Sequence, residues 1–165
     1  MKIIEPSITQ FKPIATDRCI KLRTEAFNKL FLKEIGRDAV IASAGAYAPE
    51  DIIRLAESNP FFVAEVQKEL VGFIGSKIHD ENTIEILFLY VHLGFLKQGI
   101  GSGLLGHFEE YITKNLPNIN LIVVDTIIPK YNQKFYEKMG YVKAGDSFCN
   151  YPSGKVRAVR LQKRL

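Results

Sequence analysis

Four glycines within eight positions mark the segment "GFLKQGIGSGLLGHFEE", residues 94–110. They are Gly99, Gly101, Gly103 and Gly106, and they fall where an apolar run gives way to helical periodicity. Glycine destabilises a helix because its backbone loses the most freedom on folding. The N-terminus of a helix, however, presents unpaired N–H groups and a partial positive charge, and glycines there let an anion approach the backbone. The segment therefore predicts a phosphate-binding loop that opens a helix. The alternative is a tight turn in which glycine only permits close packing.

The residues around this loop predict a mixed sheet covered by helices. The strand "TIEILFLYV" is almost wholly apolar, which is typical of a central strand. In the helix that follows the glycines, Ile100, Leu104, Phe108 and Ile112 recur four apart, as on a buried helix face. In chain order we expect helices from Asp17 to about residue 35 and from Pro49, strands within residues 61–78 and 83–91, the helix after the glycines, a strand "NLIVVDT", a helix "KYNQKFYEKMG", and two strands, "YVKAG" and the C-terminal segment. This order predicts the α/β (α+β) class, and the length of 165 residues predicts a single domain over residues 1–165.

Charge and cysteine content narrow the classes of function. The net charge of +4 is mild, and the basic residues of the C-terminal "GKVRAVRLQKRL" alternate with apolar ones, as in a strand with one solvated face. This pattern does not favour a nucleic-acid partner, whereas an anionic small ligand fits it. The longest apolar run is too short to span a bilayer, and the N-terminus lacks the apolar core of a signal peptide, so we expect no membrane partner. Cys19 and Cys149 suit neither a disulfide framework nor a close-spaced metal site, so we expect a cytoplasmic protein without a metal.

Two common phosphate-binding motifs fit the glycine segment poorly. A Walker loop ends in GK[ST], which "GSGLLG" lacks. Gly101, Gly103 and Gly106 spell the dinucleotide fingerprint G-x-G-x-x-G, and Asp125 lies near the distance expected of its ribose-binding acid. In that motif the strand runs almost directly into the first glycine, whereas "HLGFLKQ" intervenes here. A nucleotide-dependent oxidoreductase is therefore the weaker alternative.

A third motif fits best, because "VHLGFLKQGIGSGLL" resembles the acetyl-coenzyme A signature of the GNAT acetyltransferases, V-x-P-x-Y-[QR]-G-x-G-I-G-x-x-L-L. Without a gap, Val91 takes the strand-end position, Phe95 the aromatic position, and Gly99 and Gly101 the glycines. The later segment "NQKFYEKMGY" is similar to the family's F-Y-E-K-x-G-F signature. The resemblance implies the GNAT fold, a mixed central β-sheet of about seven strands with helices on both faces. It also implies an N-acetyltransferase that moves an acetyl group from acetyl-CoA, its co-substrate, to a small-molecule or peptide primary amine by direct attack in a ternary complex.

The segment departs from the signature at three positions. The family's Gln or Arg falls on Leu96, its first glycine on Lys97 and its proline on Leu93. Gln98 offers a second register, shifted by two residues, that would use Gly101 and Gly103 instead. We prefer the first register because it keeps Val91 and the Leu104–Leu105 pair in place, and Lys97 could supply the missing positive charge.

The resemblance also implies roles for individual residues. The Val91 N–H would polarise the thioester carbonyl, the Leu89 backbone would hold the pantetheine arm, and the Tyr136 hydroxyl would protonate the departing thiolate. Asn132, one helical turn before Tyr136, would touch the pantetheine or adenylate portion of the cofactor; the alternative is that it simply opens the helix. Together the cofactor-binding candidates are Leu89, Val91, Leu96, Lys97, Gln98, Gly99, Ile100, Gly101, Ser102, Asn132 and Phe135. For Tyr136 the alternative is an aromatic residue of the core.

Glu85 is the candidate general base. It aligns with the glutamate that serves as base in the histone-acetylating branch of the family, and a two-residue period places it on the side of Leu87, Leu89 and Val91. Burial would raise its pKa, which suits a base that acts through water. The alternatives are an exposed charge at a strand edge, or His79 or His92 as the base.

The acceptor pocket is expected from the first two helices and the segment "FCNYPSG", taken as a loop before the last strand. These offer Tyr47, Tyr151, Glu25 and Asp146, which suit many amines. The principal alternative function is a non-catalytic module that binds coenzyme A or a peptide on the same scaffold.

Overall fold

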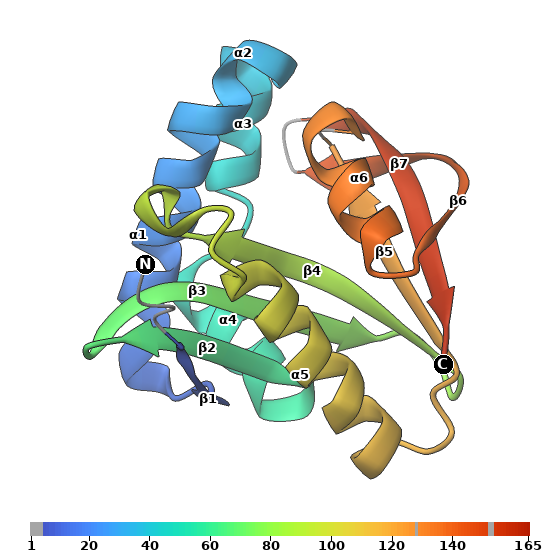
Figure 1. The fold of residues 1–165 in the computed structure, drawn as a ribbon. Coiled ribbons are helices and arrows are strands. Elements are labelled where there is room, and N and C mark those ends of the chain that lie inside the picture. The colour runs from blue at the N-terminus through green and yellow to red at the C-terminus, as the bar shows by residue number, and fades with distance from the viewer. Residues whose placement is uncertain (1–4, 128, 152–153) are drawn as a thin grey trace.

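The computed structural model describes residues 5–127, 129–151 and 154–165, which form a seven-stranded sheet with helices on both faces (Figure 1). The N-terminal half holds β1 (Ser7–Gln10), η1 (Pro13–Ala15), α1 (Thr16–Ala26), the π-helical turn η2 (Phe27–Phe31), α2 (Leu32–Ile35), α3 (Arg37–Ala44), α4 (Pro49–Ser58), β2 (Phe61–Val66) and β3 (Glu69–Ile78). The C-terminal half holds β4 (Thr83–Val91), η3 (Leu93–Phe95), α5 (Ile100–Asn115), β5 (Leu121–Thr126), α6 (Pro129–Lys138), β6 (Val142–Tyr151) and β7 (Gly154–Arg164). The mixed sheet and its helices confirm the predicted fold class.

The sheet separates between its two central strands. The strand order is β1-β2-β3-β4-β5-β7-β6, and every neighbouring pair is antiparallel except β4 with β5. The parallel β4–β5 ladder runs from Thr83↔Leu121 to Ile86↔Val124. Beyond this ladder β4 continues to Val91 beside β3, and in Figure 1 β4 and β5 run together at the lower right and diverge towards the top. The end of β4 therefore has a side that β5 does not cover.

Two hydrophobic cores hold the layers together. On one face, Leu104, Phe108 and Ile112 of α5 are fully buried against Ile84 and Ile86 of β4, in a core that also takes in Tyr136 of α6. On the other face, Cys19 and Leu22 of α1 and Ile52 of α4 pack against Phe73 and Phe88. Burying a Leu, Ile or Phe side chain contributes about 1.5–3 kcal/mol, so these cores fix the positions of α5 and α6 on β4.

A β-bulge in β4 exchanges the faces on which its side chains lie. Gly75 pairs with Phe88 but Ser76 pairs with Ile86, so Leu87 is the extra residue. Before the bulge Ile84 and Ile86 lie in the α5-side core, and Glu85 between them faces the α1–α4 side. After the bulge Leu89 and Val91 pack on the α5 side. The expectation that Glu85 shares a face with Leu89 and Val91 is therefore wrong, because a simple two-residue period does not survive a bulge.

Three further elements differ from the sequence prediction. The edge strand β1 was not expected, because its mostly exposed residues show no apolar alternation. Helix α3 follows Gly36, whose φ of 82° breaks the preceding helix. Strand β6 extends to Tyr151, so residues 148–151 belong to the β6–β7 hairpin and not to a loop. Within the described residues no helix is long and apolar enough to cross a membrane.

Candidate functional site

The glycine segment forms the entrance to α5. Gly99 is the residue that caps the helix, with a left-handed φ of 83°, and Lys97 is also left-handed at φ 61°. The Gly103 N–H donates to the Gly99 carbonyl at 2.8 Å, so the N–H groups of Ile100, Gly101 and Ser102 precede the first helical hydrogen bond. These amides and the positive end of the helix dipole are suited to an anion.

A cavity of about 500 Å³ extends from this loop to α6 and the end of β4. Ten of the predicted site residues line it, namely Leu89, Val91, Leu96, Lys97, Gly99, Gly101, Ser102, Asn132, Phe135 and Tyr136. Three do not line it: Glu85, Gln98 and Ile100. The Ile100 side chain is buried in the core, and the exposed Gln98 donates from its Nε2 to the Gly94 carbonyl at 3.0 Å. The cavity therefore gathers the loop, the β4 edge and the α6 tyrosine that the sequence suggested separately.

Gly101 keeps part of this cavity open. A Cβ at Gly101 would lie 3.5 Å from the Phe135 ring and 3.6 Å from Val91, an ordinary contact distance. The protein itself therefore leaves room for a side chain, and the glycine instead keeps the helix entrance accessible from the cavity. Gly103 and Gly106 lie inside α5, where a Cβ added at Gly106 would meet no atom within 4 Å. In the dinucleotide fingerprint the first glycine forms the turn before the helix, and the third permits close packing of the helix on the strand. Here Gly101 already lies inside α5 and Gly106 has open space around it, so the dinucleotide interpretation is wrong.

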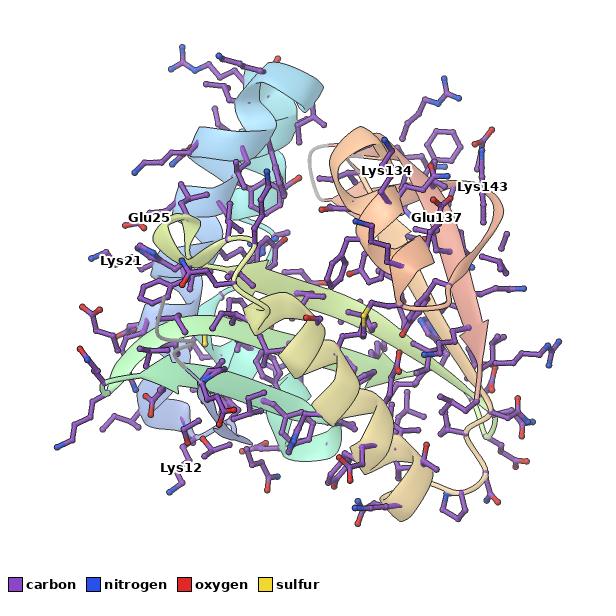
Figure 2. All side chains as sticks on the ribbon, viewed as in Figure 1. Lys12, Lys21, Glu25, Lys134, Glu137 and Lys143 are labelled. Carbon is purple, nitrogen blue, oxygen red and sulfur yellow. The ribbon has the colours of Figure 1, made fainter. Side chains whose placement is uncertain are left out.

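Lysines make the mouth of the cavity positive. Lys97 of the loop and Lys134 and Lys138 of α6 all line it. Figure 2 shows Lys134 on α6. Three ammonium groups along this cavity add to its attraction for a polyanion.

The free side of β4 turns backbone amides towards the cavity. The His92 N–H donates to the Val71 carbonyl at 2.7 Å. His92 and Val71 are therefore a hydrogen-bonded pair of the antiparallel β3–β4 ladder. Hydrogen-bonded and non-bonded pairs alternate, so Val91 and Leu89 direct their N–H and C=O groups away from β3. Because β5 has diverged there, these groups face the uncovered side of β4.

Tyr136 lies at the inner end of the cavity. Its side chain is 5% exposed, and its ring contacts Phe135 and Tyr141 edge-on, with centroids 5.1 and 5.4 Å away. Burial, followed by the neighbouring Tyr90, raises the pKa of the Tyr136 phenol above its ordinary value. The hydroxyl therefore stays protonated at any physiological pH. Asn132, one turn earlier, donates to Thr126 Oγ1 at 3.0 Å and ties the start of α6 to the end of β5.

The candidate bases lie outside the large cavity. Glu85 is hydrogen-bonded to His79 Nε2, and neither residue lines the cavity. His92 caps η3, where its Nδ1 accepts from the Gly94 N–H at 3.1 Å. The structure thus separates Glu85 from Tyr136 and brings it instead to a histidine that the sequence offered as its competitor.

A smaller cavity of about 90 Å³ adjoins the large one and shares Phe31, Leu89, Tyr90, Asn132 and Tyr136 with it. Its other lining residues are Phe27, Ile86, Leu87, Val124, Asp125, Thr126, Ile127 and Cys149. The sequence did not predict that these residues meet, because they come from separate elements: η2, β4, the end of β5 with Ile127, and β6. Only the spacing of Phe27 and Phe31, one helical turn apart, hinted at a shared surface.

Of the residues predicted for the acceptor pocket, Tyr47, Glu25 and Asp146 do not line this smaller cavity. Tyr47 packs edge-on against Phe88, with ring centroids 4.8 Å apart. Glu25 lies on α1, and Asp146 is exposed and pairs with Lys143 at 3.7 Å. The Tyr151 side chain lies outside the described residues. Among the described residues no group of three or more His, Cys, Asp or Glu side chains could hold a metal ion.

Comparison with known proteins gives one family. The model of the acetyltransferase (GNAT) family matches residues 20–141. No curated protein sequence matches the chain.

Solved structures of similar fold cover nearly the whole chain. A GCN5-related N-acetyltransferase from Rhodopseudomonas palustris has a TM-score of 0.84 at 17% identity, covering 100% of this chain and 99% of its own. The PaiA N-acetyltransferase of Thermoplasma acidophilum, in complex with coenzyme A, has a TM-score of 0.77 at 17% identity, and the match covers 97% of this chain and 99% of its own. An acetyltransferase of the GNAT family from Staphylococcus aureus Mu50 has a TM-score of 0.75 at 22% identity, and the match covers 97% of this chain and 99% of its own.

Proposed function

Because this chain belongs to the acetyltransferase (GNAT) family, we propose that it transfers the acetyl group of acetyl-coenzyme A to a primary amine by direct attack in a ternary complex. One observation carries the proposal. A single cavity joins the open N-terminus of α5, the free edge of β4 and the Tyr136 side chain. An anion-binding end, a row of amides and a buried proton donor are what a long phosphorylated thioester requires.

The chain's residues divide the binding of such a co-substrate among them. The amides of Ile100, Gly101 and Ser102 would hold the pyrophosphate, and Lys97 would add charge where the family signature has glycine. The Leu89 and Val91 backbone groups would hold the pantetheine arm and donate to the thioester carbonyl. This donation stabilises the negative charge that develops on the carbonyl oxygen during attack.

The proton balance of the reaction needs an acid and a base. Acetyl-coenzyme A supplies the thioester, whose C–S bond breaks as the amine nitrogen bonds to the carbonyl carbon. Tyr136 would then give its proton to the departing thiolate, for which its raised pKa keeps it in the acid form. The proton lost by the amine would pass to Glu85 through water, because Glu85 lies outside both cavities.

Two measurements on the wild-type protein test this function. Calorimetry should detect binding of coenzyme A, and a thiol-release assay should detect free coenzyme A only when an amine is present. Mass spectrometry of the amine should show the added acetyl group. Binding of coenzyme A without acetylation of any amine would indicate a non-catalytic binding module instead.

Leu96→Arg should bind coenzyme A about tenfold more tightly than the wild type. Leu96 lines the cavity at the position where the family signature has Gln or Arg. An arginine there would restore a charge-assisted contact to a phosphate, worth about 1–2 kcal/mol. Calorimetry with coenzyme A measures the change directly.

Gln98→Ala is the matched control for the register. Since Gln98 turns its amide onto Gly94, its removal should leave the affinity unchanged. A large loss in Gln98→Ala, with no gain in Leu96→Arg, would contradict the first register and favour the second.

Glu85→Gln should lower turnover by about tenfold or more near pH 7, and the loss should shrink as the pH rises. The amide cannot accept the proton of an ammonium ion, whereas at high pH more of the amine is already neutral. Rates between about pH 6.5 and 10 measure the effect. His79→Gln is the companion variant, because a similar loss there would implicate the Glu85–His79 pair as a unit. An equal loss for Glu85→Gln at every pH would remove Glu85 as the base.

A further inference from the structure

The smaller cavity and the charged residues around it indicate which kind of amine accepts the acetyl group. We propose that the acceptor is an α-amine, an amino group on the carbon next to a carbonyl group, as in an amino acid or at the N-terminus of a peptide. This inference rests on the proposed acetyl transfer. Four features of the described residues support it: the size of the smaller cavity, the pairing of its charges, the donor at Tyr90 and the position of Glu85.

The smaller cavity is the place for the acceptor amine. It adjoins the large cavity at Leu89, Tyr90 and Tyr136, where the thioester would lie under the proposed function. Its volume of about 90 Å³ compares with about 500 Å³ for the large cavity. Only a small group fits there, so the acceptor should present its amine on a short arm.

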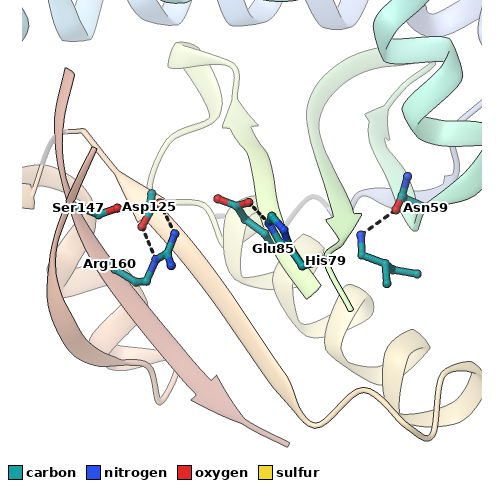
Figure 3. Close-up of polar contacts among 7 residues, drawn as sticks. Asn59, His79, Glu85, Asp125, Ser147 and Arg160 are labelled. Atoms are coloured by element: carbon teal, nitrogen blue, oxygen red, sulfur yellow. Dashed lines mark hydrogen bonds and ion pairs between the residues drawn. The ribbon is translucent and has the colours of Figure 1, made fainter. Parts of the chain in front are cut away.

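The carboxylate in this cavity is already neutralised. Asp125 is the one acid among the described residues that line it. Its two oxygens accept from Arg160 Nε at 2.9 Å and from the Arg160 guanidinium at 2.7 Å, and Ser147 Oγ adds a hydrogen bond at 3.1 Å (Figure 3). Because Arg160 already neutralises the Asp125 carboxylate in a bidentate pair, little negative potential remains to attract an ammonium ion.

The surrounding charges do not favour a polycation either. Glu85 is hydrogen-bonded to His79, as Figure 3 also shows. The buried Arg23 guanidinium lies within 4.9 to 6.0 Å of the ring centroids of Phe27, Tyr47, Phe88 and Tyr90 and donates to the Ser43 carbonyl. The two negative charges of Asp125 and Glu85 are balanced by the guanidinium groups of Arg160 and Arg23. A long polyamine would therefore gain no net attraction here.

Tyr90 supplies a polar group suited to a carbonyl oxygen. It lies on β4 between Leu89 and Val91, and it is among the residues that line both cavities. The Arg23 guanidinium hydrogen-bonds to its hydroxyl oxygen. With its oxygen accepting from a cation, the hydroxyl is best used as a donor. A carbonyl or carboxylate oxygen beside the attacking amine would accept that hydrogen bond.

An α-amine also needs the least help with deprotonation. Glu85 lies outside the cavity and would work only through water. At a peptide N-terminus, where the neighbouring carbonyl is an amide, the α-amine has a pKa of about 7.7–8.0 against about 10.4 for a lysine side chain, so its neutral fraction at pH 7 is roughly 10²-fold larger. The site therefore suits an amine that is already partly neutral.

A panel of amines with the wild-type protein tests the inference. Alaninamide, alanine and an alanyl tripeptide present α-amines, whereas Nα-acetyl-lysine amide, propylamine and spermidine do not. We expect kcat/KM at pH 7 to be roughly 10²-fold higher for alaninamide than for Nα-acetyl-lysine amide, and this ratio to fall to about tenfold at pH 9.5. Alanine and the tripeptide then separate a free amino acid from a peptide N-terminus as the source.

Tyr90→Phe tests the carbonyl contact. It should raise KM for alaninamide about tenfold. KM for propylamine should stay unchanged, because propylamine has no oxygen that could accept a hydrogen bond from Tyr90. Equal losses for both amines would overturn the role of Tyr90. Preference for spermidine or propylamine over alaninamide at pH 7 would overturn the inference while leaving acetyl transfer intact. Absence of coenzyme A binding and of thiol release with every amine would instead overturn the proposed function.

Discussion

Gly101→Glu is expected to lower the affinity for coenzyme A by at least about 100-fold, equivalent to about 2.7 kcal/mol. The new side chain would leave the helix at the cavity wall between Phe135 and Val91, where Gly101 now leaves open space. Its carboxylate would occupy the place of the pyrophosphate and repel what remained of it. Calorimetry with coenzyme A measures the loss.

The fold of this variant should survive. An acidic residue in the first turn of a helix is favoured by the helix dipole, so glutamate at this position does not oppose α5 itself. Gly106→Glu is the matched control, because Gly106 lies on the same helix, has open space around it and does not line the cavity. Both variants should melt cooperatively, and only Gly101→Glu should lose binding. Unchanged affinity in a folded Gly101→Glu protein would disprove the assignment of the α5 entrance as the phosphate site.

The parts of the site that the sequence predicted are those encoded locally. The glycines, the apolar strand before them and the helix after them lie within residues 83–115, so spacing alone places Gly99 and Gly101 at the entrance of α5. The residues "NQKFYEKMGY" similarly place Phe135 and Tyr136 on one short helix. Both segments also resemble signatures of one family. That resemblance predicted that the two segments face each other across one cofactor site.

The features that the sequence did not predict depend on contacts between distant residues. The bulge at Leu87 appears only in the pairing of β4 with β3, and it moves Glu85 to the opposite face from Leu89. The pairing of Asp125 with Arg160 joins residues 35 positions apart, because β7 returns antiparallel beside β5. Asp125 therefore looked like a free acid in the sequence, whereas the fold makes it half of an ion pair.

Tyr136→Phe is expected to lower turnover by roughly 10²-fold or more while leaving coenzyme A affinity nearly unchanged. The substitution keeps the ring that packs against Phe135 and Tyr141 and removes only the hydroxyl. Without that proton the thiolate must leave as an anion or take a proton from water, and the barrier rises. Binding is preserved because the α5 amides and the β4 edge are untouched.

The pH profile adds a check on the same hydroxyl. Burial raises the pKa of Tyr136, so the acid form persists beyond the ordinary titration of tyrosine, and the wild-type rate should show no loss from this group below about pH 10. Tyr141→Phe is the matched control: its hydroxyl donates to Glu109 at 3.0 Å and it lines neither cavity. Removing that hydroxyl should cost some stability but little turnover. If Tyr136→Phe turns over its best acceptor at the full rate, Tyr136 is a packing residue, and the thiolate must take its proton from water or from the acceptor itself.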